Sequence, residues 1–111
     1  MIRITKVREY FPINQKTGEW ELVCTGDIRE TKEFKNLQEA IEWVKEDVKE
    51  HGVEFSDLEE CNGNDLQVNV VEEEFDRDTG RWVKVGVNVC YWFERVSKIN
   101  TRKILEKTRS G

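Results

Sequence analysis

Apolar and polar residues alternate with a period of two along the last part of the domain. Residues 81–96 read RWVKVGVNVCYWFERV, and their odd positions from Val83 to Phe93 are all apolar. Residues 66–75, LQVNVVEEEF, begin with the same alternation. A period of two is typical of a strand that buries one face. The DRDTG between the two segments supplies a glycine suited to a tight turn, so the pattern predicts a β-hairpin.

The first third of the chain predicts a second hairpin with a similar turn. Residues 2–11, IRITKVREYF, alternate, and QKTGEW at 15–20 repeats the Thr-Gly-charge-Trp order of the later turn. We expect residues 19–25 to return as a strand and residues 28–34 to extend as a third one. In the returning strand, one side is expected to carry Trp20, Leu22 and Cys24.

Between these strand pairs the pattern changes to that of a helix. Apolar residues recur every three or four positions over 37–51. Asn36 and Glu39 resemble a capping box, and Gly52 is placed to end the helix. The predicted fold class is α+β: an antiparallel four- to five-stranded sheet, with two Thr-Gly hairpins, and one main helix packed on one face. We expect residues 1–96 to form this single domain and residues 97–111 a basic, possibly helical, C-terminal extension.

The charged residues make the body of the chain acidic. The chain has 111 residues, of which 37% are charged, and its net charge is −5. Residues 9–94 contain 9 Lys and Arg against 22 Asp and Glu, a balance of −13, whereas both ends of the chain are basic. An acidic body repels nucleic-acid phosphates and favours a protein partner with a basic surface.

The predicted partner-binding residues combine an acidic cluster with two tryptophans. They are Glu72, Glu73, Glu74, Asp76, Asp78, Trp82 and Trp92. The two tryptophans lie on the strand face opposite the valines, where they either pack beneath other segments or form an exposed aromatic face that binds a partner. Beside basic residues such a face suits single-stranded nucleic acid, whose bases stack on aromatic rings. For that alternative the binding residues are Arg3, Lys6, Arg8, Lys98, Arg102, Lys103, Lys107 and Arg109.

No motif predicts catalysis, a cofactor or a metal site. The DTG at 78–80 also occurs in aspartic proteases, but Asp78 stands in a charged turn rather than in a dry cleft. The loop around Gly63 lacks acidic ligands at the two ends of a calcium-binding pattern. His51 has no recognisable nucleophile partner. We therefore expect a protein that is not an enzyme and uses no cofactor.

Cysteine spacing and hydropathy indicate a compartment. Cys24, Cys61 and Cys90 are widely spaced, as is typical of reduced thiols in a cytoplasmic protein. No apolar run approaches the length of a membrane helix, and the first residues lack the apolar block of a secretory signal. We expect a small cytoplasmic binding or inhibitor protein that occupies a partner's surface. A narrower hypothesis is a phage or mobile-element anti-defence protein that mimics nucleic acid and inhibits a nuclease.

Overall fold

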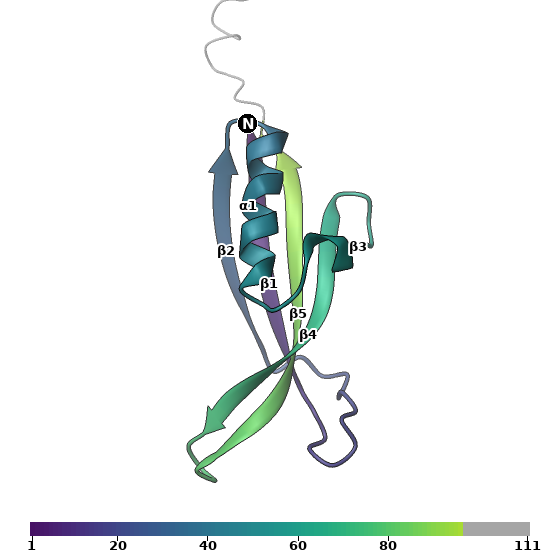
Figure 1. Ribbon diagram of the computed structural model, residues 1–111, viewed down its shortest axis with the longest axis vertical. Helices are drawn as coiled ribbons and strands as arrows, with labels where there is room; N and C mark the ends of the chain where they lie inside the picture. Colours follow the sequence, from purple (N-terminus) through teal and green to yellow (C-terminus); the bar gives the residue numbers. More distant parts are fainter. Residues whose placement is uncertain (97–111) are drawn as a thin grey trace, which may run out of the picture.

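The computed structural model describes residues 1–96, which form a five-stranded antiparallel sheet with one main helix on one face (Figure 1). The sheet order is β2-β1-β5-β4-β3, and the predicted α+β class is confirmed. The predicted C-terminal helix lies outside the described residues. The strands are β1 (Ile2–Pro12), β2 (Gly26–Phe34), β3 (Glu59–Glu60), β4 (Asp65–Asp76) and β5 (Arg81–Arg95). The helices are α1 (Leu37–Lys49) and the short 3-10 helix η1 (Phe55–Asp57).

β4 and β5 form the hairpin that the alternation predicts. The register places Val70 opposite Val87 and Asp76 opposite Arg81. Gly80 has a φ of +67°, and its N–H donates to the C=O of Asp76 at 2.8 Å. The carboxylate of Asp76 also accepts hydrogen bonds within the turn, so this residue fixes the reversal of the chain.

The other predicted hairpin is wrong beyond its turn. The chain does reverse near Gly18, and one bridge joins Ile13 to Trp20, but residues 21–25 form no strand. Leu22 is 95% exposed rather than packed on one side of a strand. The physical reason is that β2 pairs with β1 as far as Tyr10, so only the last residues of that edge of β1 are left for the returning chain. The N–H of Glu21 donates to the C=O of Pro12 at 2.9 Å and the N–H of Thr25 to the C=O of Tyr10 at 2.8 Å, and residues 22–24 between them belong to no strand.

The core lies between α1 and the sheet face that it covers, called here the helix face. Asn36 caps α1, since its Oδ1 accepts from the N–H of Glu39 at 2.9 Å. The helix ends at Lys49, two residues before the predicted boundary. The odd positions of β5 from Val85 to Tyr91 are buried on this face, as predicted. The largest fully buried side chains are Tyr91, Ile4, Val44, Val48, Val87 and Val89.

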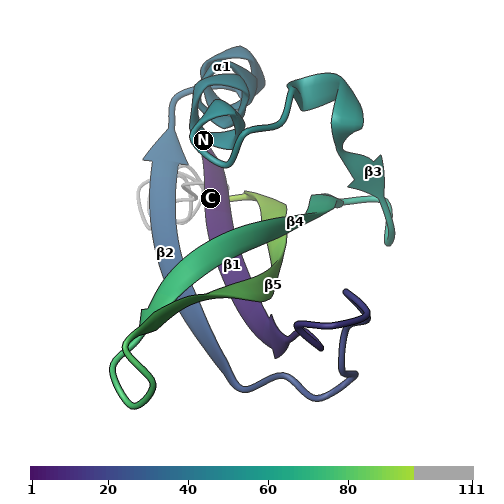
Figure 2. The same ribbon diagram turned by 60° about the horizontal axis from the view of Figure 1, so that its bottom comes forward.

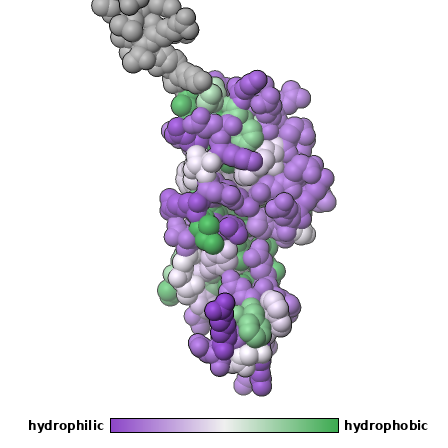
Figure 3. All heavy atoms as spheres, turned by 90° about the vertical axis from the view of Figure 1, so that its left-hand side faces the viewer, coloured by the Kyte–Doolittle hydropathy of each residue, from purple (hydrophilic) through white to green (hydrophobic). Residues whose placement is uncertain are grey.

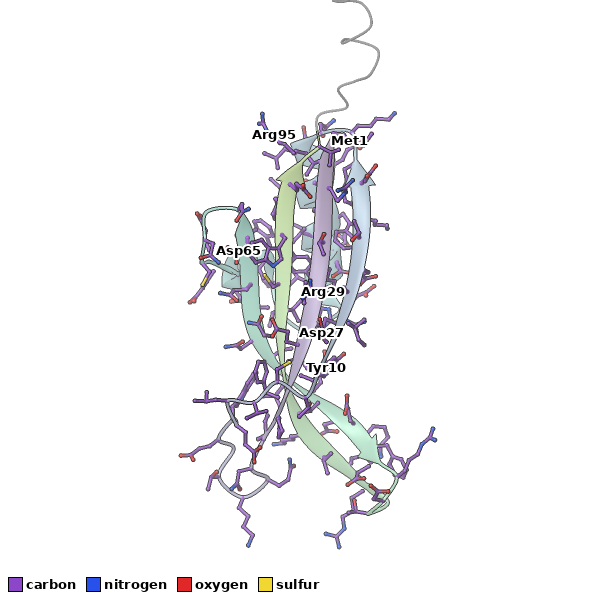
Figure 4. The ribbon with its side chains drawn as sticks, turned by 180° about the vertical axis from the view of Figure 1, so that it is seen from behind. Met1, Tyr10, Asp27, Arg29, Asp65 and Arg95 are labelled. Carbon is purple, nitrogen blue, oxygen red and sulfur yellow. The ribbon has the colours of Figure 1, made fainter. Side chains whose placement is uncertain are left out.

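β4 and β5 continue beyond the end of α1. Figures 1 and 2 show their hairpin extending from the sheet at the same end as the loop of residues 13–25. We call residues 71–85 the distal ribbon, and the sheet face opposite α1, seen in Figure 4, the outer face. These two features position the candidate site.

Candidate partner-binding surface

The distal ribbon is two strands wide in the described part of the chain. β1 ends at Pro12, opposite Val85, and β3 pairs only with the start of β4. Beyond Pro12 the side chain of Gln15 replaces β1 for a single residue. Its Nε2 donates to the C=O of Lys84 at 2.9 Å, and its Oε1 accepts from the N–H of Lys84 at 3.0 Å. A two-stranded hairpin is marginally stable alone, so the ribbon depends on its continuity with the covered sheet.

The outer face of the distal ribbon exposes three large apolar side chains. Val71 is 54% exposed, Phe75 51% and Trp82 67%. The rings of Phe75 and Trp82 face each other across the strands, with centroids 5.6 Å apart and an interplanar angle of 61°. Such a pair contributes about 0.5–1.5 kcal/mol. Because most of the Trp82 surface remains in water, this cluster has the character of an interaction site.

A second aromatic group closes the base of the distal ribbon. Trp20 lies against Gly86, where an added Cβ would stand 2.6 Å from the nearest ring carbon. Phe11 packs beside this tryptophan, with ring centroids 5.8 Å apart. A glycine is required at position 86 because any side chain there would displace the indole. Trp20 therefore has a structural reason for its place, whereas Trp82 pairs with the ring of Phe75 and remains 67% exposed.

Trp92 shares the outer face with Trp82 but lies far from it. It is 39% exposed and stands opposite Thr5 and Asp65, a residue labelled in Figure 4. Ten positions along an extended strand correspond to about 33 Å. The sequence predicted one binding set that contained both tryptophans, but the structure divides them into two separate patches.

The acidic cluster is also divided, because residues directly opposite each other share a sheet face. Glu72 and Glu74 stand opposite valines of β5 on the helix face, whereas Glu73 stands opposite Lys84 on the outer face with Trp82. Glu72 contacts His51 at the end of α1, with Oε1 3.1 Å from the imidazole Nδ1. Asp76 and Asp78 lie at the turn of the distal ribbon. The cluster is therefore divided between the two faces and the turn, and Glu73 shares the outer face with the aromatic pair.

The basic residues near the N-terminus do not gather at the tryptophans. Arg3 lies on the outer face, but ion pairs join it to Glu33 at 3.1 Å and to Glu94 at 3.5 Å. Arg8 is half-buried on the helix face. Lys6 is 4% exposed, so it is absent from the surface where the nucleic-acid alternative needs it. The remaining basic residues of that set lie outside the described residues: Lys98, Arg102, Lys103, Lys107 and Arg109.

Lys6 is buried by an ionic network that joins three elements. Its Nζ lies 2.6 Å from Oδ2 of Asp47 on α1, and the hydroxyl of Tyr91 on β5 donates to the same oxygen at 2.7 Å. Burial, with the hydrogen bond to Asp47, raises the pKa of Tyr91 far above its ordinary value, so the phenol stays neutral. Both charges have partners, and the network is structural. One signal was visible in the sequence, because Lys6 interrupts the apolar positions that begin with Ile2 and Ile4.

Sequence reasoning missed a polar cavity beside β3. Asn88 donates from Nδ2 to Oδ1 of Asn69 at 2.8 Å and to Oε1 of Gln67 at 3.2 Å. These amides, with the carboxylates of Asp57 and Glu59, line an open cavity of about 330 Å³. The two acidic residues that line the cavity lie at the edge of the sheet where β3 stops pairing with β4.

Comparison with known proteins identifies no relative: no family model matches the chain, and neither the curated proteins nor the solved structures contain a match. Within residues 1–96, no helix is long and apolar enough to cross a membrane. Over the same residues, no three His, Cys, Asp or Glu side chains gather as a group that could hold a metal ion.

Proposed function

We propose that this chain is a non-enzymatic binding protein whose distal ribbon anchors on a partner protein. The observation that carries the proposal is the 67% exposure of Trp82 beside the half-exposed ring of Phe75. A few aromatic side chains supply most of the binding energy in protein interfaces. Figure 3, which shows one side of the molecule, has a largely hydrophilic surface with separate apolar spots, so an exposed aromatic pair is a local feature rather than a general property.

The charge of the body favours a basic partner. Residues 9–94 have a balance of −13, and Glu73, Asp76 and Asp78 lie close to the aromatic pair along the chain. Charges at the rim of an interface mainly raise the association rate, and their effect falls as salt shortens the Debye length to about 8 Å at physiological ionic strength. A buried aromatic anchor mainly slows dissociation. We expect these two groups of residues to affect binding in different ways.

The test is affinity capture from a lysate of the organism that encodes the chain. We compare the wild type with Phe75→Ala/Trp82→Ala and with a matched control, Leu22→Ala/Val23→Ala, which removes two other exposed apolar side chains. A protein retained by the wild type and the control, but lost with the ribbon variant, would support the proposal if nuclease treatment leaves it bound. Capture that is equal for all three variants, or that disappears with nuclease, would contradict it.

Kinetic measurements with the purified partner separate the effect of the aromatic pair from that of the acidic residues. Reversal of Glu73 and Asp78 to Lys, which leaves the turn residue Asp76 in place, is expected to slow association about tenfold at low salt and to change dissociation little. Trp82→Ala is expected to speed dissociation instead. The narrower hypothesis of a nuclease partner predicts that duplex DNA or RNA competes with the chain for that partner. Simultaneous binding of all three molecules would reject this narrower hypothesis alone.

No contact among residues 1–96 favours the alternative of single-stranded nucleic acid. The tryptophans stand apart, Lys6 is buried, and Arg3 is paired with carboxylates. Fluorescence anisotropy with labelled single-stranded DNA and RNA is expected to show no binding at physiological salt. Sub-micromolar binding that disappears on removal of residues 97–111 would favour the alternative.

A further inference from the structure

We propose that the partner binds as an extended, basic segment that adds a strand to the outer edge of β4 along the distal ribbon. This inference rests on the proposed function and specifies the chemistry of the partner. Strand addition uses the backbone hydrogen bonds of an unpaired edge for affinity and the side chains along it for specificity. Strand addition to β4 needs an open backbone edge and a partner whose charge complements the side chains along it.

The backbone groups that point outward from β4 follow from its register. The N–H of Phe93 donates to the C=O of Asn64 at 2.8 Å, at the start of the β4–β5 pairing. Hydrogen-bonded pairs alternate along an antiparallel ladder, so the even residues of β4 bond to β5. The odd residues then point their N–H and C=O groups to the other side, where Gln67 faces Glu59 of β3. β3 pairs with no residue of β4 beyond Gln67, which leaves an outward edge formed by Asn69, Val71, Glu73 and Phe75.

The opposite edge of the distal ribbon is less available. On β5 the residue after the end of β1 is already capped, because the Gln15 amide bonds both the N–H and the C=O of Lys84. The outer edge of β2 belongs to the part of the sheet that α1 covers, and its side chains carry both charge signs, which blunts such an edge. The edge of β4 borders a ribbon only two strands wide, so an added strand there completes a three-stranded sheet.

The side chains along β4 define the partner strand. On the outer face the added strand would lie beside Val71 and Phe75, and on the helix face beside Glu72 and Glu74. An amphipathic strand with apolar residues on one side and Lys or Arg on the other fits both. A second copy of this chain fits poorly, because pairing two ribbons along β4 would bring glutamates of both copies together, and like charges directly opposite are destabilising.

The probe is a nine-residue synthetic peptide that alternates Lys with Val and has one central Phe. Binding to the full chain is measured by titration calorimetry at low salt, with a Glu-for-Lys peptide as the charge control. Two further peptides carry N-methyl groups on alternate amides, one set on the odd residues and the other on the even residues. Only one set can face β4, so we expect one methylated peptide to bind at least about tenfold more weakly, since it loses several hydrogen bonds, and the other to bind like the parent.

Two variants of the protein test the same edge from the other side. Glu73→Pro removes an outward N–H that no strand of the described chain uses, at a position where an edge strand tolerates proline. Glu73→Gln removes only the charge. We expect the proline variant to weaken the peptide at least about tenfold and the glutamine variant less than about threefold. Thermal unfolding of both variants checks the fold, and the methylated peptides decide the matter if the proline variant is unfolded.

The outcomes separate this inference from the proposed function. Equal binding by both methylated peptides, equal loss by both, or binding of the Glu peptide as strong as that of the Lys peptide would overturn strand addition. Partner capture that depends on Phe75 and Trp82 would then still support the proposed function. Conversely, a chain that binds the Lys peptide through the β4 edge but captures no partner would retain the edge chemistry and lose the proposed function.

Discussion

The two ends of β5 contrast a covered sheet with an uncovered one. Both ends follow the same alternation, yet Val87 and Tyr91 are completely buried beneath α1, whereas Val83 on the same face is only partly buried beyond the end of the helix. On the outer face of the distal ribbon, Trp82 is 67% exposed. A period of two assigns each side chain to a face, but it contains no information about which element covers that face. The contrast shows that a buried core and an exposed surface can follow one continuous alternation, and that the elements packed on each face decide which residues are buried.

The largest expected effect concerns the ionic network in the covered region. Asp47→Ala would leave the Lys6 ammonium buried without its closest carboxylate and the Tyr91 hydroxyl without its acceptor. We expect the free energy of unfolding to fall by about 3–5 kcal/mol. Urea unfolding measures this loss, with Glu42→Ala on the exposed side of α1 as the control, expected within about 0.5 kcal/mol of the wild type. A loss below about 1 kcal/mol for Asp47→Ala would show that solvent reaches the pair.

A matched pair of valines tests the contrast more directly. Val87→Ala in the covered region is expected to cost about 2 kcal/mol or more, from lost transfer free energy and a new cavity. Val71→Ala in the distal ribbon removes the same atoms from a side chain that is 54% exposed, and we expect less than about 0.5 kcal/mol. Urea unfolding checks both values: the midpoint should shift, while the dependence of the unfolding free energy on urea concentration stays the same. Equal losses would mean that the distal ribbon is covered in solution, which would contradict the comparison.

The spacing of apolar residues predicted the elements that have one buried and one exposed face. The helix predicted at 37–51 and the strands predicted at 66–75 and 81–96 each direct apolar residues towards the core, so apolar spacing reveals them. The strand expected at 19–25 was wrong, because alternation cannot show that β2 occupies that edge of β1 as far as Tyr10. That choice depends on pairing between segments far apart in the chain.

The candidate site was predicted only in part, because it too depends on contacts between segments far apart in the chain. The exposed Trp82 was one of two interpretations of its face. The sequence could not decide between them, because exposure on the outer face depends on which other segments pack there, as Trp20 does on Gly86. The burial of Lys6 was not predicted, since its partner Asp47 lies 41 positions away on another element. The open edge of β4 could not be predicted either, because it results from the shortness of β3.

The cysteines extend the contrast to chemical reactivity. Cys90 is buried, and this burial, together with the nearby Asp65, raises its pKa to about 12, whereas Cys24 and Cys61 are exposed. At neutral pH we expect a thiol reagent to modify two cysteines quickly in the native protein and all three after unfolding under non-reducing conditions. Rapid modification of all three in the native state would show that the covered region opens readily.

The raised pKa of Cys90 also predicts a pH dependence of stability. The native state holds this thiol neutral, whereas the unfolded chain ionises it near its ordinary value of 9.0. The contribution is therefore complete below about pH 9 and is lost as the pH rises from 9 towards 12. Relative to Cys90→Ser, the wild type should lose more stability between pH 8 and pH 10.5. Parallel urea midpoints for the two proteins over that range would contradict the prediction.

A small effect on stability is also expected for Trp82→Ala, although this substitution deletes one of the largest side chains. The side chain loses its contact with Phe75, a pair worth about 0.5–1.5 kcal/mol, and little other burial. We therefore expect the free energy of unfolding to fall by less than about 1.5 kcal/mol. Trp43→Ala is the matched control in the covered region, since that ring packs against Phe34 and Tyr91, and it should cost about 3 kcal/mol or more. If Trp82→Ala were as destabilising as Trp43→Ala, the tryptophan of the distal ribbon would belong to the core. A small loss of stability combined with faster release of a partner would instead assign Trp82 to binding.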